Sequence, residues 1–322
     1  QAEKGWHFGL THELEVTLSE KIIGHLPSAG LVRYASSGSE ANFFAVRLAR
    51  TVTKRAKIAK FEGGWHGAYD ALHVAIRPPF DILPSGGITR SCQEDTIVVP
   101  YNNLSGFLDR VRREELACVI LEPVIGAGGM IPAEREFLKG LREYCDDTGA
   151  FLVFDEVITG FRLGLSGAQG YFGVKPDITI LGKIIGGGLP IGAVCGRRDI
   201  LEHMDHTKYS GMDYAYHGGT FAGNAITLAA GLATIDFLEH SNVYEHINKL
   251  GNKTRDSLDA VFERNGFPAQ TTGIDSVFAI HMTRKKPIRD ASSFAFNDHE
   301  LSKRAFSYLL DNGIMMVTPE LL

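Results

Sequence analysis

Between residues 31 and 196, short apolar runs alternate with segments in which apolar residues recur every three to four positions. The apolar runs occupy residues 31–36, 57–61, 96–100, 117–123, 151–157, 177–183 and 192–196. The segments with helical spacing between them occupy residues 39–54, 104–115 and 134–149. Buried strands that alternate with helices predict an α/β fold, in which helices cover a mostly parallel sheet. Such folds bind their ligands at the carboxyl ends of the strands.

The order of the patterns changes after a long helical pattern at residues 218–240. It is followed by helical patterns at 242–266 and 299–313, strand patterns at 276–283 and 314–319, and a polar loop at 284–298. We therefore predict a large domain over residues 1–240 and a small α+β domain over residues 241–322. The chain starts without a methionine and the small domain lacks a closing element, so we expect both ends to be incomplete.

Composition and short motifs argue against several classes of function. Charged residues are 22% of the 322 residues and the formal net charge is −5, which argues against a nucleic-acid partner. The four cysteines include no CxxC pair, so we expect reduced thiols and a cytoplasmic protein. Residues 178–196 carry only one charge, but that charge, the glycines and Pro190 disfavour a membrane helix. The sequences after His12 and His299 lack the second histidine of an HExxH motif, and we expect no metal.

A group of small polar residues stands between a predicted strand and an amphipathic helix. Ser36, Ser37, Gly38 and Ser39 occupy this position. The free N–H groups and the positive dipole at a helix N-terminus suit an anion such as a phosphate. An ordinary helix cap, with Ser39 as the N-cap, explains the same residues, and the sequence alone favours that simpler interpretation.

Two opposite charges end two neighbouring apolar runs. Asp155 follows the four apolar residues that begin the run at 151–157, and Lys183 ends the run at 177–183. A carboxylate at the end of a central strand is costly to bury unless a cation or a strong donor meets it. The two side chains form a buried ion pair, or both face one ligand, with the lysine on a carbonyl carbon and the aspartate on a ring nitrogen. Position alone leaves both alternatives open.

Several segments resemble, in order and spacing, the class III pyridoxal-phosphate aminotransferases. The resemblance rests on "SGSEANFFAVRLAR", "KFEGGWHGAYDAL", "VILEPVIGAGGMIP", "LVFDEVITGFRLGLSGAQGYFGVKPDITILGKIIGGGLPIGA" and "GGTFAGN", and covers nearly the whole chain. The likeness is strongest to the glutamate-1-semialdehyde 2,1-aminomutase branch. It implies a fold type I enzyme with a mainly parallel seven-stranded sheet, a smaller C-terminal lobe, a homodimer and pyridoxal 5'-phosphate as cofactor.

The resemblance also implies roles for individual residues. Lys183 matches the lysine that forms the internal aldimine with the cofactor, and Asp155 matches the carboxylate that meets its ring nitrogen. The other cofactor-binding matches are Gly38 and Ser39 at the phosphate, Trp65 (a tyrosine in the family) with His66 at the ring, Val157 on the opposite ring face, Glu122 nearby, and Gly219 and Thr220 at the phosphate of the neighbouring subunit's cofactor.

Two reactions share these residues. The stretch at 82–103, which includes Ser85, resembles the mobile lid of the aminomutases. The segments "HFGLTHELEV", which contains His7, "GGWHGAYDA" and "IGAGG" depart from that branch on the substrate side. We therefore expect an aminotransferase that passes an amino group from an amino acid or amine to a 2-oxo acid or similar carbonyl by a ping-pong mechanism. The alternatives are the aminomutase, which transfers nitrogen within one molecule in tetrapyrrole biosynthesis, and a non-catalytic subunit that binds pyridoxal phosphate.

Overall fold

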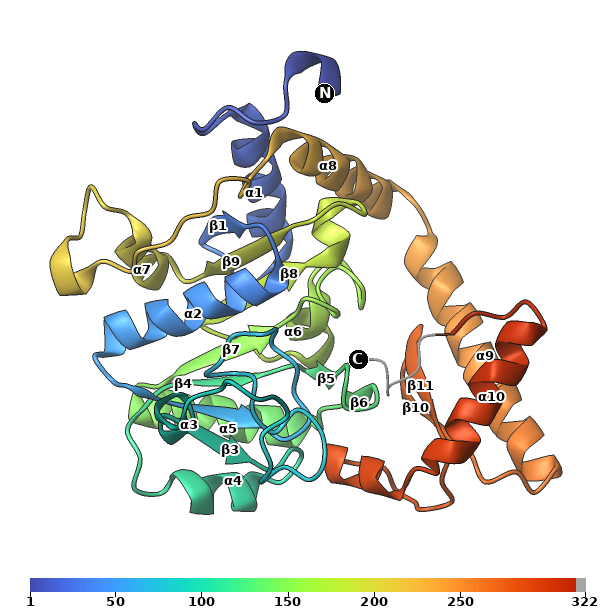
Figure 1. Cartoon of the computed structure of the whole chain (residues 1–322). Helices are drawn as coiled ribbons and strands as arrows, with labels where there is room; N and C mark the ends of the chain where they lie inside the picture. The colour runs from blue at the N-terminus through green and yellow to red at the C-terminus, as the bar shows by residue number, and fades with distance from the viewer. Residues whose placement is uncertain (317–322) are drawn as a thin grey trace.

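A seven-stranded sheet forms the centre of the protein (Figure 1), in a computed structural model that describes residues 1–316. Its strand order is β1-β9-β8-β7-β4-β2-β3. The strands span Leu31–Ala35 (β1), Lys57–Phe61 (β2), Thr96–Val99 (β3), Leu116–Leu121 (β4), Phe151–Asp155 (β7), Ile178–Gly182 (β8) and Gly192–Gly196 (β9). Only β9 runs against its neighbours, β1 and β8. The pairs β3–β2, β2–β4, β4–β7 and β7–β8 are parallel, so the mainly parallel sheet expected from the sequence is confirmed. Each apolar run before residue 197 overlaps one strand of this sheet.

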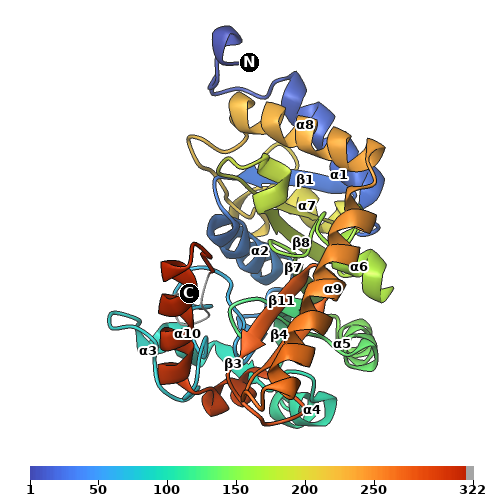
Figure 2. The ribbon, with the colours of Figure 1, turned by 90° about the vertical axis from the view of Figure 1, so that its right-hand side faces the viewer.

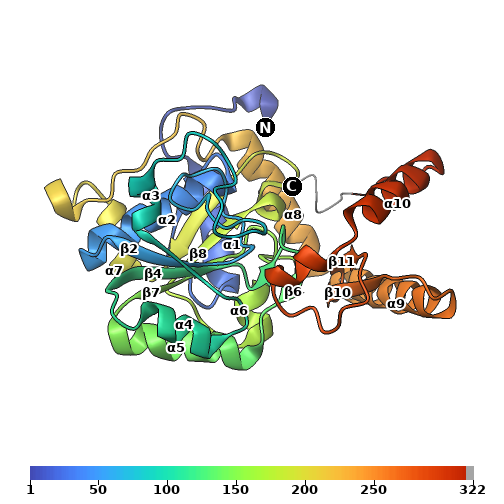
Figure 3. The ribbon, with the colours of Figure 1, turned by 60° about the horizontal axis from the view of Figure 1, so that its bottom comes forward.

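Helices cover both faces of this sheet, as the view in Figure 3 makes clear. On one face α2 (Gly38–Thr53) packs Phe44 and Leu48 against strand residues such as Ile120. On the other face lie α4 (Leu104–Val111) and α5 (Arg135–Thr148), with the short β5 (Val124–Ile125) and β6 (Ile131–Pro132) nearby. Shorter helices are α3 (Arg90–Glu94), α6 (Gly167–Phe172) and α7 (Arg198–Leu201). No helix within residues 1–316 has both the length and the apolar character needed to cross a membrane.

Two more helices, α1 (Glu13–His25) and α8 (Ala225–His240), pack together beside β8 and β9. The helix predicted at 218–240 begins only at Ala225. Asn224 caps it by accepting a hydrogen bond from the Thr227 N–H at 3.0 Å, and Gly223 before it has a left-handed φ of +68°. Helix α1 was not predicted.

The C-terminal part of the chain forms a smaller group of elements to the side of the sheet (Figures 1 and 3), which lies in front of the sheet in the view of Figure 2. It contains α9 (Val243–Arg264), the hairpin β10 (Gln270–Ile274) and β11 (Val277–His281), and α10 (His299–Asp311). Strand β10 was not predicted, and the strand expected at 314–319 lies partly outside the described residues. The division into domains at residue 240 stays a prediction.

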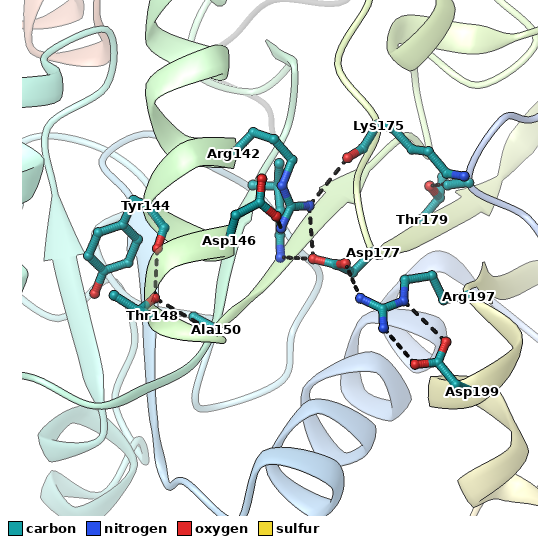
Figure 4. A network of polar contacts seen from close by, with 12 residues as sticks. Arg142, Tyr144, Asp146, Thr148, Ala150, Lys175, Asp177, Thr179, Arg197 and Asp199 are labelled. Atoms are coloured by element: carbon teal, nitrogen blue, oxygen red, sulfur yellow. Dashed lines mark hydrogen bonds and ion pairs between the residues drawn. The ribbon is translucent and has the colours of Figure 1, made fainter.

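A buried aspartate links the amino ends of β7 and β8 to the end of β9. Asp177, just before β8, accepts hydrogen bonds from the Leu152 N–H at 2.8 Å, from Arg142 Nη1 at 2.9 Å and from Arg197 Nη1 at 3.0 Å (Figure 4). Its negative charge is therefore balanced by two guanidinium groups of the same chain. This network lies at the edge of the sheet opposite to the carboxyl end of β8.

Candidate active site

A cavity of about 470 Å³ opens at the carboxyl ends of β4, β7 and β8, beside the first turn of α2. Its walls bring together segments that lie up to 155 residues apart in the sequence. The lining residues are Ser36, Ser37, Gly38, Ser39, Asn42, Trp65, His66, Gly67, Glu122, Asp155, Val157, Ile158, Lys183, Gly188, Leu189, Pro190 and Ile191. The structure therefore collects in one cavity eight of the twelve residues that the resemblance assigns to the site.

The first turn of α2 presents backbone N–H groups to this cavity. Ser37 is the N-cap and its hydroxyl accepts a hydrogen bond from the Glu40 N–H at 3.2 Å, so the expectation that Ser39 caps the helix is wrong. The Glu40 carboxylate in turn accepts a hydrogen bond from the Ser36 N–H at 2.5 Å. Gly38 and Ser39 follow the cap, where N–H groups have no acceptor within the helix. Both residues line the cavity and can offer these groups to an anion.

Glycines allow the cavity walls to pack closely at this turn. A Cβ atom on Gly67, whose φ is +85°, would lie 2.1 Å from the Ser39 Oγ. A Cβ atom on Gly38 would lie 2.8 Å from Val157 Cγ2. Side chains at these two positions would therefore push the loop after β2 and the residue after Glu156 away from α2.

Asp155, the last residue of β7, is 4% exposed and is held by three donors. Its Oδ2 accepts a hydrogen bond from Asn42 Nδ2 and contacts His66 Nδ1, both at 2.8 Å. Its Oδ1 accepts a hydrogen bond from the Val157 N–H at 3.1 Å. No ion pair joins Asp155 to Lys183 among the described residues. The alternative in which these two side chains form a buried ion pair is therefore wrong.

His66 is fully buried and contributes a neutral donor. Burial lowers the pKa of His66, and this effect outweighs the opposite effect of the Asp155 carboxylate. A neutral imidazole that faces a carboxylate through Nδ1 carries its hydrogen there, so Nδ1–H donates to Asp155. Within the described residues, the buried Nε2 atom of His66 and the buried Oδ1 atom of Asn42 have no hydrogen-bond partner.

Glu122, which follows β4, is also buried in the wall. It accepts hydrogen bonds from the Trp65 N–H at 2.8 Å and from the Gly126 N–H at 3.1 Å. Burial, and secondarily the negative charge of Asp155, raise the pKa of Glu122 to about 8. Burial therefore favours the protonated form of this carboxyl group, which fixes the backbone at Trp65.

Lys183 follows β8 directly and begins a short 3₁₀ helix that spans Lys183–Gly186. Its φ is +45°, in the left-handed region that residues with a side chain rarely adopt. Such strain persists only where the surrounding structure imposes it, and it is concentrated at functional sites. The side chain is exposed, and no hydrogen bond or ion pair to its amino group is found in residues 1–316. The amino group is therefore available to a ligand in the cavity.

Four residues expected near the site lie outside this cavity. Gly219, Thr220 and His7 line a separate cavity of about 400 Å³ between the N-terminal segment and the loop before α8. The His7 ring lies 5.4 Å from the ring of Phe221. Ser85 is exposed and its hydroxyl donates only to the neighbouring Gly86 carbonyl. None of these side chains meets Lys183 within one copy of the chain.

Two residues that the sequence analysis missed support the wall. Asn42 holds Asp155 from α2, and an asparagine on the buried face of a helix, where its helix propensity is poor, is the signal that could have identified it. Lys60 is buried in β2. Glu156, beside Asp155, has a different role, because it accepts hydrogen bonds from the N–H groups of Ala168 and Gln169 at the start of α6.

Known proteins share this fold and sequence. The sequence model of the family described as "Aminotransferase class-III" matches residues 1–319. A glutamate-1-semialdehyde 2,1-aminomutase from Sulfurisphaera tokodaii is 42% identical over 319 residues, which cover 98% of this chain and 75% of that protein. An omega-transaminase from Sphaerobacter thermophilus is 34% identical with a TM-score of 0.91, covering 100% of this chain and 75% of that one. A transaminase solved with PLP bound is 34% identical with a TM-score of 0.87, covering 98% and 73%.

These matches extend over nearly the whole described chain and agree with the fold around the cavity. The family resemblance and the fold type I architecture expected from the sequence are therefore confirmed. The chain belongs to the class III aminotransferases, a family of enzymes that use pyridoxal phosphate.

Proposed function

We propose that this chain is an aminotransferase that binds pyridoxal 5'-phosphate in the Lys183 cavity. In this proposal it moves an amino group from an amino acid or amine to a 2-oxo acid or related carbonyl compound. The observation that carries the proposal is the charge balance at Asp155. All three groups that bind this buried carboxylate are neutral, namely the Asn42 amide, the His66 imidazole and the Val157 N–H. A ligand that brings a protonated ring nitrogen supplies the missing positive charge.

The residues of the cavity wall fit this cofactor. The N–H groups of Gly38 and Ser39 would hold its phosphate, and the close approach of Gly67 leaves these groups open to the cavity. Trp65 and Val157 would contact the two faces of its ring. Asp155 and Lys183 complete the set of groups that such a ligand needs.

Asp155 can hold a proton on the ring nitrogen by charge alone. To keep that nitrogen protonated two pH units above its ordinary pKa requires about 2.7 kcal/mol. A carboxylate about 4 Å away contributes roughly 4 kcal/mol at a moderate effective dielectric constant. When bound and protonated, pyridoxal phosphate accepts electrons and stabilises negative charge on the substrate carbon. The three neutral donors keep the Asp155 carboxylate in place for this interaction.

Lys183 would bind the cofactor's carbonyl carbon and later act as the general base. Its amino group would accept the proton from the substrate carbon that carries the nitrogen. It would donate this proton again in a later step of the same transfer. Lys183 has a strained backbone and directly follows β8. In the sheet, β8 is two strands from β4, which Glu122 follows. The exposed side chain allows the amino group to move when a substrate displaces it.

The aminomutase is the second candidate, because the Sulfurisphaera tokodaii relative at 42% identity has that name. Support for the aminotransferase comes from the Sphaerobacter thermophilus omega-transaminase, whose structure overlaps with a TM-score of 0.91. It also comes from the substrate-side departures in the segments "HFGLTHELEV", "GGWHGAYDA" and "IGAGG". In an aminotransferase the first product leaves before a second carbonyl compound takes the amino group, whereas in the aminomutase one molecule gives and receives it.

The absorption spectrum of the protein with added pyridoxal phosphate tests both candidates. We expect visible absorption that falls when a suitable amino donor is added and returns when a 2-oxo acid follows. A Lys183→Ala variant should bind the cofactor reversibly but catalyse no transfer. An unchanged spectrum after cofactor addition would refute the proposal, and turnover of glutamate-1-semialdehyde without any acceptor would establish the aminomutase instead.

We also propose a homodimer in which Thr220 serves the neighbouring subunit's cofactor. Thr220 is exposed and lies outside the Lys183 cavity, so in one copy it contacts no ligand there. Large apolar side chains are exposed around it, which is typical of a surface that another protein covers. They are Trp6, Phe8, Leu10, Tyr216 and Phe221. A cytoplasmic location, supported by four free cysteines, stays part of the proposal.

A further inference from the structure

Lys60 is the one fully buried lysine among the described residues, and the chemistry proposed above does not use it. It lies in β2, on the face of the sheet covered by α2, two residues after the core residue Ile58. Its whole side chain is 0% exposed, at a position that an apolar residue would fill without desolvating an amino group. A lysine at such a position requires partners that offset the cost of its burial.

The amino group of Lys60 binds both ends of the loop that follows β2. It donates to the Gly64 carbonyl at 2.9 Å and to the Val74 carbonyl. Beside it, the Gly63 N–H donates to the Ala75 carbonyl at 2.8 Å. Residues 62–75 contain no helix or strand, so these contacts replace the regular hydrogen bonds that such a buried segment would otherwise need.

This loop carries three residues that line the cavity, Trp65, His66 and Gly67. The Trp65 N–H donates to Glu122, and His66 donates to Asp155. A shift of the loop backbone would therefore move the partners of both buried carboxyl groups at once. Lys60 contacts none of the cavity directly, but it holds the segment on which these contacts depend.

We propose that Lys60 is a positioning residue of this site, whose amino group fixes the backbone of residues 62–75 and, through it, Trp65 and His66. The electrostatics agree with this arrangement. Burial lowers the pKa of Lys60 to about 7, while the nearby Glu122 acts in the opposite direction. A positive charge on Lys60 in turn helps to lower the pKa of His66, which keeps the imidazole neutral beside Asp155.

The fluorescence of Trp65 tests the proposal without any ligand. The chain has two tryptophans, so a Trp6→Phe background leaves Trp65 as the only one. In this background Lys60→Met should raise the acrylamide quenching constant of Trp65 about threefold, because the loop loses two of its backbone anchors. The matched control is Lys57→Met, three residues earlier in β2, where the lysine pairs with Glu114 at the opposite end of the strand. Unchanged quenching in folded Lys60→Met would overturn the proposal.

Any role of Lys60 in catalysis rests on the proposed function. A measurement of pyridoxal phosphate binding can distinguish a failure of that function from a failure of the positioning role. We expect Lys60→Met to weaken pyridoxal phosphate binding about tenfold, with Lys57→Met unchanged. If the unsubstituted protein binds no pyridoxal phosphate, the proposed function fails, while the quenching result still decides the role of Lys60. If the unsubstituted protein and Lys60→Met bind it equally, the positioning role fails.

A second variant and a second measurement cover a folding failure. Lys60→Gln keeps an N–H donor on a side chain that is one bond shorter, and should give intermediate quenching. Amide hydrogen exchange of the unsubstituted protein tests the loop with no substitution at all. Residues 63–75 should exchange at least about tenfold more slowly than the exposed residues 80–88. Equal exchange in the two segments would contradict an anchored loop.

Discussion

Replacing the Asp155 carboxylate by an amide of the same shape should separate its chemical role from its structural one. In Asp155→Asn one oxygen can still accept hydrogen bonds from Asn42 and His66. The new NH₂ group then faces the Val157 N–H at the former 3.1 Å contact, where two donors meet. One lost hydrogen bond of this kind destabilises a protein by about 1–2 kcal/mol. The fold should therefore survive.

The effect on catalysis should be much larger. Loss of the negative charge removes roughly 4 kcal/mol of attraction for a protonated ring nitrogen, if the groups are about 4 Å apart at an effective dielectric constant of 20. Since about 1.4 kcal/mol corresponds to a factor of ten, kcat/KM should fall roughly a thousandfold. Pyridoxal phosphate should still bind, through the first turn of α2, with a changed absorption spectrum.

Asp177 offers a matched control, because it is 5% exposed where Asp155 is 4% exposed. It also accepts a backbone hydrogen bond, but at the amino end of the sheet and beside Arg142 and Arg197. Asp177→Asn should lower the free energy of unfolding by about 3 kcal/mol, since Arg142 keeps a partly buried charge while Arg197 is half-exposed. Its kcat/KM per folded molecule should be unchanged.

Both variants are compared by urea unfolding and by steady-state kinetics with the donor identified spectroscopically. The reasoning is wrong if Asp155→Asn keeps kcat/KM within tenfold of the unsubstituted protein. It is also wrong if Asp177→Asn loses as much activity per folded molecule as Asp155→Asn, because the carboxylate would then act only through stability.

Three further predictions test other parts of the site. Gly67→Ala should weaken cofactor binding at least about tenfold, because its Cβ would lie 2.1 Å from the Ser39 hydroxyl oxygen. The control Gly87→Ala has a similar φ of +88° but open space around the Cβ, so its cofactor binding should be unchanged. Equal binding constants for the two variants would contradict the close-packed turn. Mixing Lys183→Ala subunits with Thr220→Ala subunits should restore about a quarter of the full activity, because one intact site forms in each mixed dimer; no recovery after confirmed subunit exchange would exclude a shared site. The pKa of Glu122 is raised to about 8 in the folded protein, from an ordinary value of 4.5. The contribution of Glu122 to the free energy of unfolding is therefore fully present below pH 4.5 and is lost as the pH rises to 8. The unfolding free energy of Glu122→Gln relative to the unsubstituted protein should therefore improve from pH 5 to pH 8, and a constant difference would argue against a protonated Glu122.

The sheet was predictable because each of its strands coincides with a short run of apolar residues in the sequence. The same pattern failed for β10, where Gly273 and three polar residues leave no apolar run. It also failed for the start of α8, because the apolar residues before Asn224 continue the helical spacing although the backbone turns at Gly223. Local patterns thus predicted the strands of the large sheet, but missed α1 and β10 and the start of α8.

The contacts of the site were less predictable, because their partners are far apart in the chain. Asn42 meets Asp155 across 113 residues, and nothing near either residue indicates the other. Lys60 was hidden for a different reason. In "KIAKF" a lysine on a strand suggests a solvent-facing side, and only the fold places it under α2.

Charge balance explains why one edge of this sheet provides stability and the other provides function. At the amino end of β8 Asp177 meets two arginines, so the chain neutralises its own buried carboxylate. At the carboxyl end of β7 Asp155 meets only neutral groups, although a buried charge without a counter-charge costs several kcal/mol. The neutral donors fix the position of the Asp155 carboxylate but leave its charge for a cationic ligand. In the proposed function the exposed Lys183 amino group has its own task, because it is not needed to balance Asp155 and can bond to a carbonyl carbon.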